Sequence, residues 1–216
     1  MTELHEGQPV LTAGTDLDRA SSAMVMIHGR GATARDILTL APELDLPGWA
    51  FLAPQAAGDT WYPYPFTAPI EQNEPWLSSA LAVVGEVLVR IAARGIPSER
   101  TVLLGFSQGA CLTLEYAART ARRYGGVAGL SGGLIGPDGA ERDDRGSLEG
   151  TPVFLGCSDK DPHIPAERVR HAGRTLEGLG AEVTTLLYPN LGHAVNGDEI
   201  GHVRRIMSGV GAPRPA

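Results

Sequence analysis

Six short apolar segments place the strongest constraint on the fold of this chain. They are apolar throughout rather than at every second residue, and they occupy residues 23–28, 49–53, 101–105, 126–130, 152–157 and 183–188. Strands of this kind are buried on both faces, which is typical of a mainly parallel sheet. The sequence therefore predicts a sheet with helices packed on both of its faces.

Helical patterns alternate with these segments. In residues 74–94, apolar side chains recur every three or four positions and so lie on one helical face. Further helices are predicted at residues 34–41, 108–123, 165–179 and 197–209. This alternation predicts one doubly wound α/β domain over residues 1–216. In such sheets ligands bind beyond the carboxyl ends of the strands.

A pentapeptide at one of these strand ends carries a candidate nucleophile. Residues 105–109 read Gly-Phe-Ser-Gln-Gly and lie between a predicted strand and a predicted helix. In this setting Gly-x-Ser-x-Gly is the nucleophile elbow, a sharp turn that exposes the serine hydroxyl. Side chains at Gly105 and Gly109 would collide in so tight a turn. The pattern predicts Ser107 as the nucleophile.

A serine hydroxyl needs a base to take its proton and a third group to orient that base. With this elbow the chain order is serine, acid, histidine, so the base follows the serine. His193 lies in the loop directly after the last predicted strand, whereas His171 and His202 lie within helical patterns and His163 lies in the candidate acid loop. We predict His193 as the base.

Two carboxylates follow the strand predicted at residues 152–157. The Asp-x-x-Ile-Pro arrangement at residues 161–165 favours Asp161 as the acid. Asp159 is then interpreted as a turn-forming residue whose side chain bonds nearby backbone amides.

An oxyanion formed during acyl transfer requires hydrogen-bond donors, usually backbone N–H groups. One candidate is the N–H of Gln108, which follows the serine at the positive end of its helix. The second is predicted in the His-Gly-Arg-Gly turn at residues 28–31, and we assign it to Arg30. His28 is interpreted as a structural residue because it precedes the serine.

Charge and composition limit the kinds of partner and the location that we expect for this protein. A net charge of -7 argues against nucleic acid or an anionic membrane surface as a partner. No stretch approaches the ~18 apolar residues of a membrane span, and the N-terminus does not read as a signal peptide. We expect a cytoplasmic protein without stable membrane insertion. Cys111 and Cys157 lie in apolar segments and are interpreted as buried free thiols. A homodimer is compatible with the sequence.

These pieces together resemble the phospholipase/carboxylesterase family of α/β-hydrolases, which includes bacterial carboxylesterases, acyl-protein thioesterases and lysophospholipases. The matching pieces, in chain order, are residues 28–31, 53–55, 61–62, 105–109, 130–132, 161–165 and 192–193. The resemblance implies an α/β-hydrolase fold without a large lid. It also implies hydrolysis of carboxylic esters with no cofactor or metal, with Ser107, Asp161 and His193 as the triad.

The resemblance also bears on the substrate. It marks Trp61 and Tyr62 as substrate-binding residues, within an aromatic and proline-rich segment at residues 58–69 that is predicted to wall the pocket. The alternative is a loop packed on its own rings. Acyl-protein thioesterases usually have an apolar residue where this chain has Arg30, which disfavours long-chain or lipidated-protein substrates.

A second segment, at residues 136–147, is predicted to be a polar, mobile surface loop, too short and polar to form an apolar cap. An uncapped site favours short- to medium-chain esters as the small-molecule substrates. Two alternatives stay open. The same triad could hydrolyse thioesters or lysophospholipids, or the fold could serve as a receptor that binds without turnover.

Overall fold

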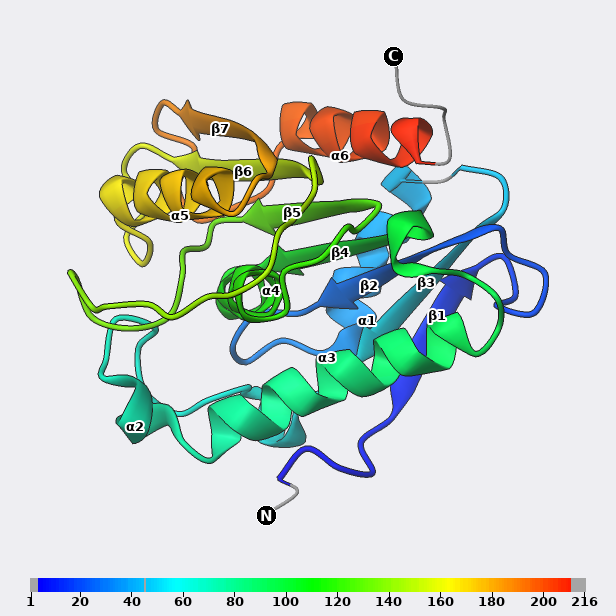
Figure 1. Cartoon of the computed structure of the whole chain (residues 1–216), viewed down its shortest axis with the longest axis horizontal. Coiled ribbons are helices and arrows are strands. Elements are labelled where there is room, and N and C mark those ends of the chain that lie inside the picture. The colour runs from blue at the N-terminus through cyan, green and yellow to red at the C-terminus, as the bar shows by residue number, and fades with distance from the viewer. Residues whose placement is uncertain (1–3, 45, 211–216) are drawn as a thin grey trace.

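The computed structural model describes residues 4–44 and 46–210 and is built around one seven-stranded sheet (Figure 1). The strand order is β1-β3-β2-β4-β5-β6-β7, and all neighbouring pairs are parallel except β1 with β3. The strands are β1 Val10–Gly14, β2 Ser22–Ile27, β3 Trp49–Pro54, β4 Thr101–Phe106, β5 Gly126–Leu130, β6 Pro152–Ser158 and β7 Glu182–Tyr188.

All six predicted strands are confirmed, each to within one residue at either end. β1, an antiparallel edge strand, was not predicted. It reads Val-Leu-Thr-Ala-Gly, and its residues are half-buried or exposed at the edge of the sheet.

The helices are α1 Ala34–Ile37, α2 Ile70–Asn73, α3 Trp76–Ala92, α4 Gln108–Arg119, α5 Ala166–Gly178 and α6 Gly197–Gly209. Short 3₁₀ segments occupy Leu38–Leu44, Ala57–Asp59 and Ser98–Arg100. The helix predicted over residues 34–41 is wrong in its second half, which continues as a 3₁₀ segment that contains Pro42. The helix predicted to run to residue 123 ends at Arg119, because Thr120 leaves helical backbone geometry.

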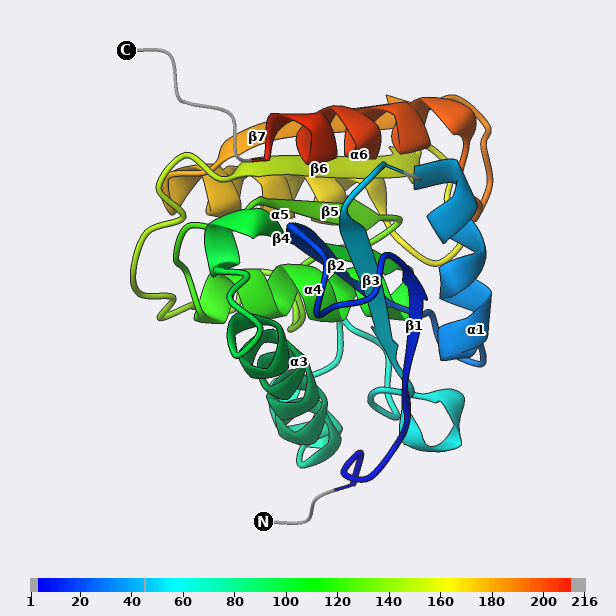
Figure 2. The ribbon, with the colours of Figure 1, turned by 90° about the vertical axis from the view of Figure 1, so that its right-hand side faces the viewer.

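Helices cover both faces of the sheet, as the apolar segments predict (Figures 1 and 2). α3, α4 and α5 pack on one face, and α1 and α6 pack on the other. In β2, Val25 and Ile27 pack in the hydrophobic core under α3, α4 and α5, while Met24 and Met26 pack in the core under α1 and α6. Every residue of β2 is therefore buried, on one face or the other.

The order of the strands positions a crevice at the centre of the sheet. β2 has β3 on one side and β4 on the other, so the chain leaves the ends of β2 and β4 in opposite directions. Such a switch point opens a crevice at the carboxyl ends of the strands. The turn at residues 28–31 follows β2 and Ser107 follows β4, so both lie at this crevice.

None of the helices within the described residues combines the length and apolarity that crossing a membrane would require.

Candidate active site

Ser107 lies in the turn between β4 and α4 in an unusual backbone conformation, with φ of 56° and ψ of -121°. A Cβ atom on Gly105 would lie 2.2 Å from the carbonyl oxygen of Gly109, and one on Gly109 would lie 2.2 Å from that of Ile27. No side chain fits at either position. The steric reason for both glycines is therefore confirmed, and the strain is of the kind found at functional sites.

His193 joins Ser107 to Asp161. Its Nε2 atom lies 2.8 Å from Ser107 Oγ, and its Nδ1 atom lies 2.7 Å from Asp161 Oδ2. The other carboxylate oxygen of Asp161 accepts the N–H groups of His163 and Ile164, at 2.8 and 3.0 Å. The three side chains that the sequence analysis selected are thus linked by hydrogen bonds.

The environment of Asp161 favours its charged form. Burial acts to raise the pKa of this carboxyl, but the hydrogen bonds from His193 and from the amides of His163 and Ile164 outweigh it, so the pKa lies below its ordinary value. An ionised carboxylate only accepts hydrogen bonds. His193 must therefore donate from Nδ1, which leaves Nε2 free to accept the hydroxyl proton of Ser107.

Side chains next to Asp161 tie the acid loop to the loop of His193. Asp159 Oδ1 accepts the N–H of Asn190 at 2.8 Å, and Ser158 Oγ accepts the N–H of Gly192 at 3.1 Å. Asp159 does bond a backbone amide, as predicted, but that amide lies 31 residues away rather than in its own turn. Ser158 was missed because its partner is 34 residues distant.

Both cysteines are free and buried, as predicted. Burial raises the pKa of Cys111 to about 11 and that of Cys157 to about 12, so both thiols stay protonated. The Cys157 thiol lies 3.7 Å from Asp161 Oδ2 and donates toward it, a contact that the sequence pattern does not predict.

The two predicted oxyanion donors lie at the ends of β2 and β4. Within residues 4–44 and 46–210, neither the N–H of Arg30 nor that of Gln108 bonds another protein group. His28 is fully buried. Its Nε2 accepts the N–H of Ala56 and its Nδ1 donates to the carbonyl of Gly29, while burial lowers its pKa. A neutral imidazole thus holds the turn, consistent with its interpretation as a structural residue.

A cleft of about 490 Å³ opens beside Ser107 and His193. Four residues of the aromatic segment line it, namely Tyr62, Pro63, Pro65 and Phe66. The other lining residues are Arg30, Gln108, Cys111, His163 and Ile164. The aromatic segment therefore forms one wall of the cleft.

Trp61 does not line this cleft, so its prediction as a substrate-binding residue is wrong for the side chain. The indole is fully buried, lies against the His28 ring with centroids 5.0 Å apart and planes tilted by 36°, and donates its N–H to the carbonyl of His28 at 2.9 Å. Its size and its polar N–H suit it to burial beneath the turn. Tyr62, its neighbour, lines the cleft instead.

A larger hollow of about 650 Å³ lies at the opposite edge of the sheet, near the amino ends of β4 to β7. Exposed arginines, including Arg100 and Arg205, line it, and it contains none of the predicted site residues. Among the described residues, no three His, Cys, Asp or Glu side chains gather as metal ligands would.

A serine on a strand-turn-helix elbow, bonded to a histidine and an acid beyond a mostly parallel sheet, defines the α/β-hydrolase class. The sequence profile of the phospholipase/carboxylesterase family matches residues 14–209, and the chain belongs to this family of serine hydrolases.

The individual relatives are named either as carboxylesterases or as acyl-protein thioesterases. A crystal structure of a phospholipase/carboxylesterase from Dyadobacter fermentans DSM 18053 is 47% identical, with a TM-score of 0.89 over 94% of this chain and 97% of the other. A protein of Oryza sativa subsp. japonica named as a probable carboxylesterase is 28% identical over 202 residues, 84% of this chain and 75% of the relative.

Acyl-protein thioesterase 1 of Gibberella zeae is 33% identical over 122 residues, 52% of this chain. The match spans 49%, or about half, of the length of that relative. The family assignment therefore includes both carboxylesterases and acyl-protein thioesterases.

Proposed function

We propose that this protein is a serine carboxylesterase that hydrolyses short- to medium-chain carboxylic esters through an acyl-enzyme on Ser107. The observation that carries the proposal is the hydrogen-bonded chain from Ser107 through His193 to Asp161 at the mouth of the cleft, with links of 2.8 and 2.7 Å. Nucleophile, base and orienting acid are the groups that acyl transfer requires.

In the first half-reaction Ser107 Oγ forms a bond to the ester carbonyl carbon while His193 Nε2 takes the hydroxyl proton. The C–O bond to the alcohol then breaks, and His193 returns the proton to the leaving oxygen. In the second half-reaction His193 takes a proton from water, and the resulting hydroxide attacks the acyl-enzyme. The carboxylic acid leaves, and Ser107 recovers its proton from His193.

Charge develops at two places during each half-reaction. The ionised Asp161 stabilises the imidazolium that forms on His193. The carbonyl oxygen becomes an oxyanion, for which we assign the N–H groups of Arg30 and Gln108 as donors. Their lack of other hydrogen bonds within the described chain supports this role, because unpaired donors are free to meet the substrate.

The cleft supports a preference for modest acyl chains. Tyr62 and Phe66 give it apolar walls, Pro63 and Pro65 stiffen that wall, and Cys111 lies next to Tyr62 at the buried side. A volume of about 490 Å³ suits a small ligand, with apolar walls and few polar groups.

The test is hydrolysis of p-nitrophenyl esters from acetate to dodecanoate. We expect kcat/KM to be highest with short and medium acyl chains, and Ser107→Ala to reduce turnover at every length to background. Ser107→Ala removes only the hydroxyl group and is expected to leave the elbow intact. Circular dichroism checks that the variant is folded. Activity retained in Ser107→Ala would remove the acyl-enzyme from the proposal.

The second candidate function is acyl-protein thioester hydrolysis by the same residues, favoured by the Gibberella zeae relative. Matched octanoyl ester and octanoyl thioester substrates separate the two. A kcat/KM higher for the thioester, together with faster turnover of dodecanoate than of butyrate, would move the assignment to thioesterase.

A further inference from the structure

The side chain of Arg30 lies at the rim of the cleft and binds the loop that forms the cleft wall. Its guanidinium donates hydrogen bonds to the main-chain oxygens of Tyr62, Pro63 and Tyr64, at 2.7, 2.9 and 3.1 Å. The acceptors belong to three consecutive residues, and all are carbonyls rather than carboxylates. A charge that the sequence places beside the acyl groove is thus engaged by the loop.

The carboxamide of Gln108 holds the same loop from the side of the elbow. It accepts the N–H of Trp61 at 3.0 Å and donates to the carbonyl of Tyr62 at 2.8 Å. The Tyr62 oxygen therefore receives one hydrogen bond from Gln108 and another from Arg30. These are the two residues whose main-chain N–H groups we assign to the oxyanion.

Two further bonds join the turn at residues 28–31 to the same loop. The N–H of Gly31 donates to the carbonyl of Asp59 at 2.7 Å, and the indole N–H of Trp61 donates to the carbonyl of His28 at 2.9 Å. The backbone of Arg30 is thus anchored on both sides by the loop that its own side chain binds. Displacement of the loop would displace the N–H of Arg30.

The three carbonyl groups of residues 62–64 explain why a cation is needed at this position. Three carbonyl oxygens that converge on one point repel one another, and a guanidinium compensates them with a planar set of N–H donors that an ammonium does not match. Oxyanion donors stabilise a transition state only when they are aimed before the charge develops.

We propose that the Arg30 side chain is a positioning residue that clamps residues 62–64 to the 28–31 turn and so keeps the oxyanion N–H groups aligned. The inference rests on the proposed function, because it assigns the clamp an effect on acyl transfer. Substitution of Arg30 leaves its main-chain N–H in place. Any loss of kcat therefore reports on the side chain.

The experiment compares Arg30→Met and Arg30→Lys with the wild type, using p-nitrophenyl butyrate well below each melting temperature. We expect kcat to fall by about 100-fold in Arg30→Met, the size of effect that a misplacement of ~1 Å produces. The kcat of Arg30→Lys should lie between those of the wild type and Arg30→Met. Arg204→Met is the matched control, because Arg204 is also exposed and bonds a main-chain carbonyl, that of Glu43, far from the site.

Chemical rescue separates positioning from general stability. Guanidinium at a low, non-denaturing concentration should raise kcat of Arg30→Ala several-fold and leave the wild type unchanged, with equal urea as the control. Wild-type kcat in Arg30→Met, or no rescue of Arg30→Ala, would overturn the clamp. A wild type inactive on every ester would instead overturn the proposed function, so the two failures are distinguishable.

Discussion

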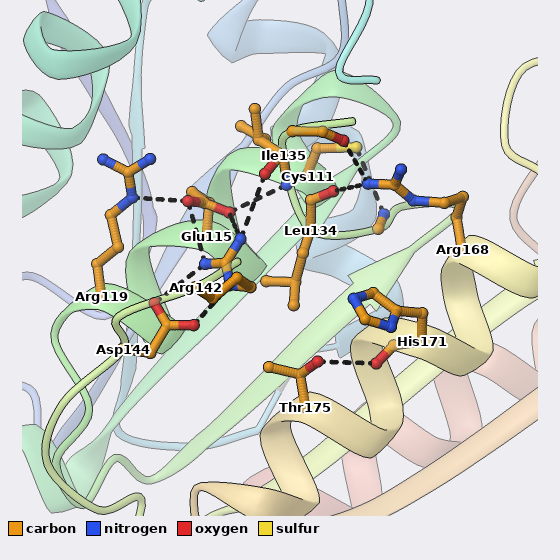
Figure 3. Close-up of polar contacts among 12 residues, drawn as sticks. Cys111, Glu115, Arg119, Leu134, Ile135, Arg142, Asp144, Arg168, His171 and Thr175 are labelled. Carbon is orange, nitrogen blue, oxygen red and sulfur yellow. Dashed lines mark hydrogen bonds and ion pairs between the residues drawn. The ribbon is translucent and has the colours of Figure 1, made fainter. Parts of the chain in front are cut away.

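Two arginine-based supports hold the cleft wall, and they differ in what the arginine binds. On the rim, exposed Arg30 bonds the main-chain carbonyls of residues 62–64. Behind the wall, residues 134–147, here called the strap, are held by buried ion pairs (Figure 3). The strap reaches the wall through the N–H of Gly136, which donates to the carbonyl of Phe66 at 2.8 Å.

The ion pairs of the strap centre on Glu115 of α4, whose side chain is fully buried. Arg142 of the strap donates to both Glu115 oxygens, at 3.0 and 3.1 Å, and Arg119 donates at 2.6 Å (Figure 3). Arg142 also pairs with Asp144. From α5, Arg168 donates to the carbonyls of Leu134 and Gly136, and its guanidinium lies over the Phe66 ring.

Because the two supports differ in burial, breaking each one is expected to cost a different amount of stability. Carbonyls released from Arg30 can turn to water, because that arginine is exposed. Glu115 cannot, so the loss of Arg142 removes one of the two arginines that compensate its buried charge within the described chain. We therefore expect the rim support to govern rate and the strap support to govern stability.

The largest expected effect on stability is that of Arg142→Met. The substitution leaves Glu115 with Arg119 and removes the arginine partner of Asp144, and both carboxylate side chains are largely buried. Breaking a buried ion pair by removing one partner costs about 3–5 kcal/mol, which corresponds to a fall in Tm of roughly 10 °C for a chain of this size. Differential scanning calorimetry measures it.

The control for that prediction is Arg145→Met in the same strap. Arg145 pairs with Asp143, but both side chains are more than three-quarters exposed, at 83% and 80%. The Tm of Arg145→Met is therefore expected to change little. The double variant Glu115→Gln/Arg142→Met should recover part of the lost Tm. Equal Tm losses in the two single arginine variants would contradict the distinction between buried and exposed pairs.

An intermediate effect is expected at Glu199, a buried carboxyl group that, unlike Glu115, pairs with no arginine among the described residues. One of its oxygens accepts the N–H of Asn196, and the other has no partner in the described chain. Burial raises its pKa from 4.5 to about 7. The folded state thus retains a proton that the unfolded state has lost, so stability falls as pH rises between about 4.5 and 7.

Glu199→Gln removes that titration. We expect the Tm of the wild type to fall more than that of the variant when the pH is raised from acidic to mildly alkaline, with a gap of at least ~2 °C at the upper end. Parallel Tm profiles across this range would mean that Glu199 ionises alike in the folded and unfolded chains.

The smallest effect is expected from Asp138→Asn. Asp138 pairs with Arg168 at 2.6 Å, but its side chain is 87% exposed, and Arg168 keeps its two carbonyl acceptors without it. Exposed pairs contribute little, so the Tm should change by less than about 2 °C. A loss as large as that of Arg142→Met would show that the strap depends on this surface pair.

Much of the fold was predictable because it follows from local patterns. Apolar runs identified six strands, and chain order with motif spacing selected Ser107, Asp161 and His193, which the structure links by hydrogen bonds. Edge strand β1, which reads Val-Leu-Thr-Ala-Gly, was not predicted. Trp61 was misassigned because the family resemblance marks a position in the loop, and it does not say which of two adjacent side chains faces the cleft.

The sequence by itself determined the doubly wound sheet, the elbow with its two glycines and the polar character of residues 136–147. Only the tertiary structure decided what the arginines bind. Arg30 meets carbonyls 32 to 34 residues away, and Arg142 meets Glu115 across 27 residues, which joins a loop predicted to be mobile to a buried carboxylate. Such partners depend on how strands, helices and loops pack together, and no local pattern of side chains encodes that packing.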